Sequence, residues 1–164
     1  MNQFIKLIIA LSLLSSAAVI AGDKSGFYFG AGYVATVDDT YFDEDTTGWA
    51  IEGGYELNRN IAFDVKLSET TYDNYDSNLS MKYLGVNAGT DFGSRVFKLY
   101  GKIGYADAAV SDGGGSDSNV ALGAGVRFAL DGDQQGFFLK AEALRAEFLG
   151  SYTTVMYAGF GFMF

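Results

Sequence analysis

Eight residues decide the fold of this chain: Ile61-Ala62-Phe63-Asp64-Val65-Lys66-Leu67-Ser68. Apolar and polar side chains alternate along them without a break. This is the pattern of a β-strand, because successive side chains of a strand point to opposite faces. The short polar segment Asn58-Arg59-Asn60 precedes them, and before it the stretch from Trp49 to Leu57 alternates in the same way. The two stretches and the tight turn between them predict a β-hairpin.

The same alternation recurs along the chain, interrupted by clusters of Gly, Asp, Asn and Ser that are typical of turns. The predicted strands cover about 26–37, 49–57, 61–68, 79–92, 97–105, 119–128, 137–148 and 154–164. This spacing predicts an all-β fold, an eight-stranded antiparallel up-and-down barrel.

The composition excludes several classes of function. The chain has 164 residues, enough for one domain, and contains no Cys, His or Pro. Without Cys there is no disulfide or thiol chemistry, and without His there is no Ser-His-Asp triad and no ordinary zinc site. The excess of 20 Asp and Glu over 11 Lys and Arg argues against nucleic acid as a partner, since phosphate binding needs a basic face. The composition still allows a hydrolase that uses paired carboxylates, but no carboxylate pair stands out in the sequence. We therefore expect no catalytic residue, no cofactor and no metal, and a protein that is not an enzyme.

The first 21 residues resemble a secretory signal peptide. Lys6 precedes a short apolar run, and small residues follow up to Ala21. The apolar run is too short to span a membrane comfortably as a helix, since about 20 residues are needed. We predict that residues 1–21 direct export and that residues 22–164 form the barrel domain.

The alternating pattern has two interpretations. A soluble barrel points its apolar face inward, whereas a barrel in the outer membrane points it toward lipid and keeps polar side chains in the lumen. Apolar faces of about ten residues, the length of a membrane-spanning strand, favour the second interpretation. Aromatic residues also gather at the strand ends, as in interfacial girdles: Phe27, Tyr55, Phe63, Phe92, Phe97, Phe128, Phe137 and Phe162 at one end, and Trp49, Tyr72, Tyr105 and Phe148 at the other. The sequence thus predicts a transmembrane β-barrel.

The lengths of the connections between the predicted strands support the transmembrane interpretation in part. Residues 58–60 and 93–95 are short turns, whereas 38–47, 73–78 and 111–117 are longer and belong at the outer rim. The connections at 131–136 and 150–153 fit this rule less well. In the seventh strand, strict alternation with Lys140 and Glu142 inside leaves Arg145 outside, so either a bulge corrects the register or Arg145 reaches the headgroup layer.

The end of the chain carries a family resemblance. Met156, Ala158, Phe160, Phe162 and Phe164 form one apolar row that finishes on a terminal Phe. This ending resembles the C-terminal strand of bacterial outer-membrane barrels, and the whole mature chain is similar to the small eight-stranded family of outer-membrane protein A barrel domains and outer-membrane protein X. The resemblance implies an outer-membrane location, a monomer surrounded by lipid, and dependence on periplasmic chaperones and the barrel-assembly machinery. It also implies that an assembly signal lies in Tyr157, Phe160, Phe162 and Phe164.

Charged residues occupy the face predicted to line the lumen: Glu52, Glu56, Asp64, Lys66, Lys98, Lys102, Arg127, Lys140 and Glu142. An eight-stranded barrel is only wide enough for its own side chains. The near balance of acids and bases therefore favours an ion-pair network that plugs the barrel, with Lys102 near a carboxylate such as Glu52. The alternative is a polar pathway for small solutes.

The predicted outer loops are acidic, and no Lys or Arg interrupts the first three. Their carboxylates are Asp38, Asp39, Asp43, Glu44, Asp45, Asp73, Asp76, Asp112 and Asp117. Such clusters could bind Ca²⁺, but no EF-hand spacing is present, and a solvated surface is the simpler interpretation. The sequence predicts a structural or surface-interaction (adhesin-like) barrel whose loop partner it does not identify, with a small-solute channel or a soluble ligand-binding barrel as alternatives.

Overall fold

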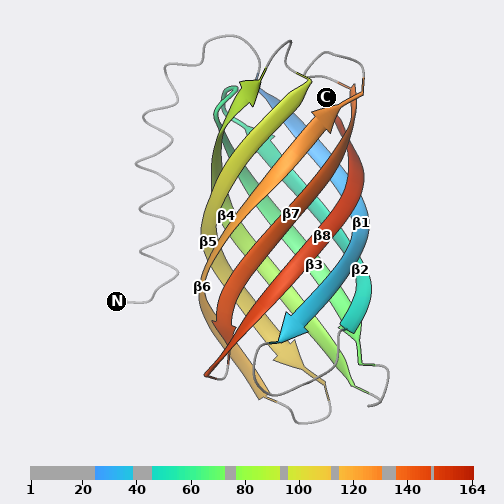
Figure 1. Ribbon diagram of the computed structural model, residues 1–164, viewed down its shortest axis with the longest axis vertical. Coiled ribbons are helices and arrows are strands. Elements are labelled where there is room, and N and C mark those ends of the chain that lie inside the picture. The colour runs from blue at the N-terminus through green and yellow to red at the C-terminus, as the bar shows by residue number, and fades with distance from the viewer. Residues whose placement is uncertain are drawn as a thin grey trace.

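The computed structural model of this protein describes residues 25–38, 46–72, 77–92, 96–111, 115–130, 136–148 and 150–164. Within these residues the chain forms eight strands that wind around one axis (Figure 1). Their bounds are β1 Gly26–Asp38, β2 Thr46–Glu56, β3 Ile61–Thr71, β4 Asn78–Phe92, β5 Phe97–Val110, β6 Gly115–Ala129, β7 Gly136–Phe148 and β8 Ser151–Met163. The described residues include no helix long and apolar enough to cross a membrane.

The strands pair antiparallel in chain order, and β8 returns to pair with β1, so the sheet closes into a barrel. The closing pair runs from Tyr28 opposite Met163 to Asp38 opposite Thr153, and the Phe164 amide donates a 2.9 Å hydrogen bond to the Phe27 carbonyl. The predicted fold class is therefore confirmed. We call the end where β1 begins and β8 ends the terminal end, and the opposite end the distal end.

The outer face of the barrel is apolar. On β3, Val65 is 46% exposed while its neighbour Lys66 is 2% exposed. The same alternation exposes apolar side chains on every strand, among them Phe29, Ile103, Leu122, Leu139 and Phe160. A soluble barrel would bury these residues inside, so that interpretation is wrong. The face turned outward is the one that suits lipid.

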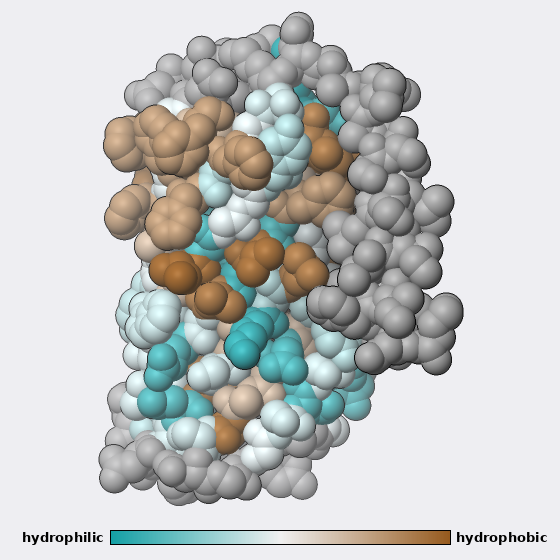
Figure 2. Space-filling model, turned by 180° about the vertical axis from the view of Figure 1, so that it is seen from behind, coloured by the Kyte–Doolittle hydropathy of each residue, from teal (hydrophilic) through white to brown (hydrophobic). Residues whose placement is uncertain are grey.

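Polar residues mark where the apolar surface ends on the distal side. Glu69, Lys82, Asp107, Arg145 and Glu147 all point outward there. In most strands the apolar row before them covers about nine residues, which at roughly 3.3 Å per residue and a tilt of about 40° spans about 23 Å. The face visible in Figure 2 is brown mainly in its upper half, toward the terminal end, and teal in its lower half. The apolar band thus matches the hydrocarbon thickness that an outer-membrane barrel covers.

Two features of the predicted distal end are wrong. Tyr72 and Phe148, expected in the outer aromatic girdle, lie inside the barrel with exposures of 6% and 7%. Trp49 and Tyr105 do face outward. Several strands also extend farther at this end than predicted: β5 continues to Val110 and β6 begins at Gly115, which shortens the connections.

The seventh strand has no bulge in its register with β8, which runs without a break from Gly136 to Phe148. Alternation holds along all of β7, so Arg145 faces outward, and its guanidinium lies 4.9 Å from the centre of the Tyr152 ring. The bulge is therefore wrong, and the other explanation, in which Arg145 reaches the headgroup layer, stays a prediction.

Inward-facing glycines make room for large side chains. Tyr100 of β5 lies opposite Gly125 of β6, and a Cβ atom at position 125 would collide with the Tyr100 hydroxyl. Gly54 has the same relationship with the ring of Tyr28. This explains why glycine alternates with charged residues on the polar faces of the strands: the glycines accept rings that lie flat against the wall.

Candidate functional site

The middle of the barrel interior is crossed by a layer of charged side chains. We call it the ionic layer; it consists of Glu52 of β2, Asp64 and Lys66 of β3, Lys102 of β5, and Lys140 and Glu142 of β7. Strand alternation turns all six inward, and each is at most 7% exposed. Three carboxylates and three ammonium groups therefore meet in the barrel interior, away from bulk water.

Glu142 is the hub of the ionic layer. Its carboxylate pairs with Lys102 Nζ at 3.0 Å, with Lys140 Nζ at 3.2 Å and also with Lys66. The Tyr100 hydroxyl donates a further hydrogen bond of 3.0 Å to Glu142 Oε2. One carboxylate thus joins β7 to β3 and β5 across the lumen.

The other two carboxylates complete the layer. Glu52 pairs with Lys140 at 2.7 Å and with Lys66 at 3.5 Å, and Asp64 pairs with Lys102 at 2.8 Å. Lys102 therefore contacts Asp64 and Glu142 rather than Glu52, the partner suggested from the sequence. The difference arises because Lys102 reaches across the lumen, and strand order alone does not say which side chain it meets there.

Tyrosine rings cover the buried lysines. Lys66 Nζ lies 3.8 Å from the centre of the Tyr157 ring, and Lys102 Nζ lies 4.4 Å from that of Tyr83. Such cation–π contacts stabilise an ammonium group that has lost water. Sequence reasoning missed the role of Tyr83 and Tyr100. Both tyrosines occupy inward-facing positions of their strands beside glycines, Gly85 and Gly125, and this pattern could have revealed their role.

A second charged group lies toward the terminal end. Glu56 accepts hydrogen bonds from Lys98, at 3.0 Å, and from Arg127. Asp91 of β4, which was not predicted as a lumen residue, lies directly opposite Lys98 on the inward face of the sheet and is half-buried. With Asp91 included, these two groups contain five acidic and five basic side chains among the described residues.

On the distal side of the ionic layer the interior is largely apolar, and six buried Ser and Thr side chains lie among the apolar ones: Thr36, Thr46, Ser68, Thr70, Ser151 and Thr153. This apolar layer is formed by buried side chains from seven strands and by Tyr72, which directly follows β3. Among the described residues it includes Val34, Ala50, Tyr72, Leu79, Met81, Ala106, Ala108, Ala121, Leu144, Ala146, Phe148 and Val155. Tyr83 and Tyr157 lie at its junction with the lysines. This layer was not predicted from the sequence, because the inward face was expected to be polar along its whole length.

Little space is left between these groups. A void of about 10 Å³ lies between Tyr28, Glu56, Lys98 and Phe138, which is room for about one water molecule. Glu52, Asp64 and Glu142 bring carboxylate oxygens within 4.8 Å of one another, a spacing that a metal ion could use. The ammonium groups of Lys66, Lys102 and Lys140 already contact these carboxylates and balance their charge. The three carboxylates are therefore suited to binding ammonium groups rather than a metal ion.

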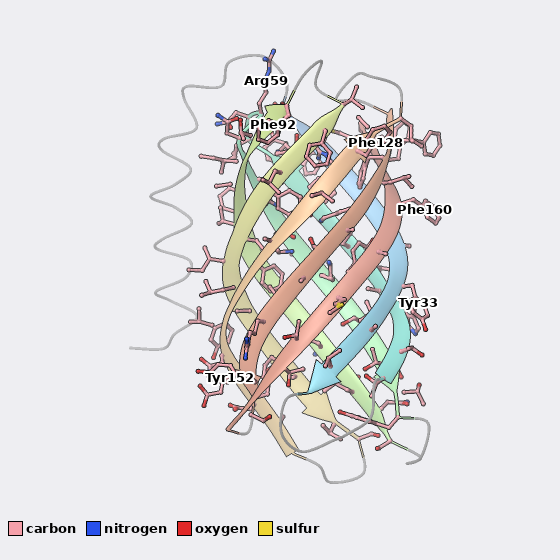
Figure 3. All side chains as sticks on the ribbon, viewed as in Figure 1. Tyr33, Arg59, Phe92, Phe128, Tyr152 and Phe160 are labelled. Atoms are coloured by element: carbon pink, nitrogen blue, oxygen red, sulfur yellow. The ribbon has the colours of Figure 1, made fainter. Side chains whose placement is uncertain are left out.

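The remaining predicted residues are the aromatic residues of β8 and the acidic residues of the loops. Phe160, Phe162 and Phe164 face outward, Phe160 pointing away from the wall in Figure 3, whereas Tyr157 is buried inside. Of the acidic loop residues, Asp117 is half-buried in β6. The side chains of Asp38, Asp39, Asp43, Glu44, Asp45, Asp73, Asp76 and Asp112 lie outside the described residues, as do those of residues 1–21.

Comparison with known proteins agrees with this geometry. Residues 7–164 match the family described as the outer membrane protein β-barrel domain. No curated protein matches the chain.

Three solved structures illustrate the similarity. Ail, the attachment invasion locus protein of Yersinia pestis, solved with the heparin analogue sucrose octasulfate, has 22% identity and a TM-score of 0.54 over 85% of this chain and 97% of its own. The outer membrane protein OprG of Pseudomonas aeruginosa has 11% identity and a TM-score of 0.63, covering 88% and 99%. Neisserial surface protein A has 18% identity and a TM-score of 0.60, covering 87% and 100%. At these identities the likeness concerns the fold alone.

Proposed function

Because this chain belongs to the outer membrane protein β-barrel domain family, we propose that it is a non-conducting barrel of structural or surface-contact type, and not an enzyme. The observation that carries the proposal is the position of Glu142, whose carboxylate holds lysines from three strands together in the middle of the lumen. A solute would have to separate these charges in order to pass.

Two further observations support a closed lumen. Charges removed from water are stabilised only by their partners, so opening the ionic layer without water to replace those partners is costly. The apolar layer lies next in the path, and its packed Tyr, Leu, Met and Phe side chains exclude ions. A polar pathway would require both layers to move.

Conductance measurement tests the proposal against the channel alternative. The purified protein is reconstituted into a planar bilayer, and a known porin is measured as a positive control. We expect little or no steady current. A regular single-channel current from the unmodified protein would contradict the plug and favour a channel for small solutes.

We place any surface contact at the distal loops. The first three loops contain several Asp and Glu residues and no Lys or Arg. Sucrose octasulfate, the ligand in the Ail structure, is a polyanion, and a polyanion would be repelled by such loops. We therefore propose that a partner of this protein presents positive charge, directly or through bridging divalent cations.

Cells that display the protein can test this charge preference. Binding to polycation-coated and heparin-coated beads is compared for the unmodified protein and for a variant with Asp43, Glu44 and Asp45 replaced by Asn, Gln and Asn. We expect retention on the polycation to depend on the three carboxylates. Equal retention of the two proteins on the polycation-coated beads would argue against this loop as the contact site.

A further inference from the structure

We propose that the outer face of β1, β2 and β3 carries a binding site for one phospholipid of the periplasmic leaflet. Its acyl chain lies in an apolar groove centred on Gly53, and its phosphate is held by Arg59. This site is on the outside of the barrel and is independent of the plugged lumen.

The groove has a physical floor and walls. It has a volume of about 460 Å³, within the range of small-ligand sites in proteins. Gly53 forms the floor: a Cβ atom added there would meet nothing closer than the Tyr28 carbonyl oxygen at 3.7 Å. Phe29 of β1 and Val65 of β3 stand on either side. The missing side chain in the middle strand therefore leaves a channel between two apolar ridges.

The terminal end of the groove is aromatic. Phe27 and Tyr55 pack with their ring centres 4.7 Å apart, and Phe63 lies opposite Tyr55 on β3. Aromatic residues of this kind lie at the level of lipid headgroups in outer-membrane barrels. The groove thus runs from the headgroup level toward the middle of the membrane, as an acyl chain does.

Arg59 lies in the turn that joins β2 to β3, at the terminal end of the groove. The turn is held by Asn58, whose side-chain oxygen accepts hydrogen bonds from the amides of Asn60, at 2.8 Å, and Ile61, at 2.9 Å. Figure 3 shows Arg59 at the terminal end, beyond Phe92. A guanidinium on a fixed turn at this level matches a phosphate, which it can bind through two parallel hydrogen bonds.

The occupant follows from these positions. The groove faces hydrocarbon, so its natural filler is an acyl chain, and the charge at its headgroup end is positive. A phospholipid supplies both the chain and the negative charge in one molecule. Lipopolysaccharide is excluded as the occupant by location, because Arg59 lies at the terminal end, which family topology puts in the periplasm.

Native mass spectrometry of the full chain in a non-ionic detergent tests the site, with phosphatidylglycerol as the probe. Gly53→Leu fills the groove, and Gly101→Leu is its matched control. Gly101 also faces outward, at the corresponding depth on β5, and a Cβ there would meet nothing closer than 3.9 Å. Arg59→Gln removes the charge, and Arg145→Gln, at the distal end, is its control. Heat-modifiable migration on gels establishes that each variant has folded.

We expect the unmodified protein and both controls to retain one phosphatidylglycerol. Arg59→Gln should weaken its binding by about tenfold, the size of one lost charge-assisted contact. Gly53→Leu, which occupies the space of the acyl chain, should weaken it by a similar factor. If Gly53→Leu does not fold, Arg59→Gln decides the matter, because position 59 lies outside the barrel wall. Equal lipid retention in all variants, or a protein dimer in place of the bound lipid, would overturn the proposal.

Discussion

Tyr100 of β5 donates a 3.0 Å hydrogen bond to Glu142 of β7 over the backbone of the strand between them. Gly125 of β6 lies opposite both residues, and its missing side chain leaves the space that the tyrosine ring occupies. One glycine therefore permits a contact that orients the hub of the ionic layer.

Replacing Gly125 with Ala should destabilise the barrel. The new Cβ atom would meet the Tyr100 ring and lie 2.8 Å from Glu142 Cβ, and such overpacking costs about 1–3 kcal/mol. Urea unfolding in lipid vesicles measures the change. Gly101→Ala is the control, since its Cβ would point into open space, and it should unfold like the unmodified protein. Equal stability of the two variants would show that Tyr100 is not held in this position.

Replacing Glu142 with Gln should cost more. The variant keeps the size of the side chain but leaves Lys66, Lys102 and Lys140 with one carboxylate fewer. Breaking a buried ion pair costs about 3–5 kcal/mol in a dry interior, and less where water enters. Glu147→Gln, on the exposed outer face of the same strand, is the control. Unfolding at unchanged urea concentration in both variants would mean that the ionic layer is hydrated.

The Asp64–Lys102 pair should show measurable coupling. A double-mutant cycle built from Asp64→Asn and Lys102→Met should give a coupling free energy of about 0.5–3 kcal/mol, as expected for residues in one network. Lys82 and Asp107, which face each other on the outside of β4 and β5, form the comparison pair. Being exposed, they should couple by no more than about 0.2–1 kcal/mol. Additive effects at the buried pair would contradict the 2.8 Å contact.

The sequence alone was enough to predict the eight strands and the face each turns to lipid, because both depend on a local period of two. The prediction failed toward the distal ends of the strands, where the outer face becomes polar and the inner face becomes apolar. In β5, Ile103 faces outward and Lys102 inward, but farther along Asp107 faces outward and Ala108 inward. Beyond the bilayer the barrel is built like a soluble one. This is why Tyr72 and Phe148, read as girdle residues, are found inside.

The interior groups were predictable as a set but not as pairs. Whether a side chain points inward follows from the alternating pattern of its own strand, so all nine charged residues could be assigned to the lumen. The contact of Lys102 with Asp64 depends on how far a long side chain extends across the barrel. The alternation of side chains along a strand does not determine this. Asp91 was missed because it lies one residue from the end of its strand, where a turn and a strand look alike.

Single cysteines at positions 65 and 66 should report opposite environments. The chain has no native Cys, so each introduced thiol can carry one spin label. A label at position 65 should be accessible to oxygen dissolved in the hydrocarbon, and a label at position 66 should be shielded from it. Lipid contact at position 66 would mean that β3 is shifted by one residue.

Phe164 is predicted to matter for assembly rather than for stability. Phe164 is 67% exposed, and its ring packs in an edge arrangement against that of Phe162, with ring centres 5.1 Å apart. Replacing it with Asp should leave the protein in the periplasm, degraded or aggregated, while Phe137→Asp, at a similar level on β7, should assemble better. Cell fractionation with heat-modifiability measures both. Normal amounts of folded Phe164→Asp in the outer membrane would rule out this residue as an assembly signal.

The pairing of β1 with β8 has a consequence for the time before the barrel exists. Tyr28 can meet Met163 only after every strand between them has been exported and arranged. Until then both terminal strands are open edges with unpaired backbone groups, which favour pairing with other chains. Contacts between residues so distant in sequence also form slowly. The chain is therefore vulnerable to aggregation during transit, until its two terminal strands have paired.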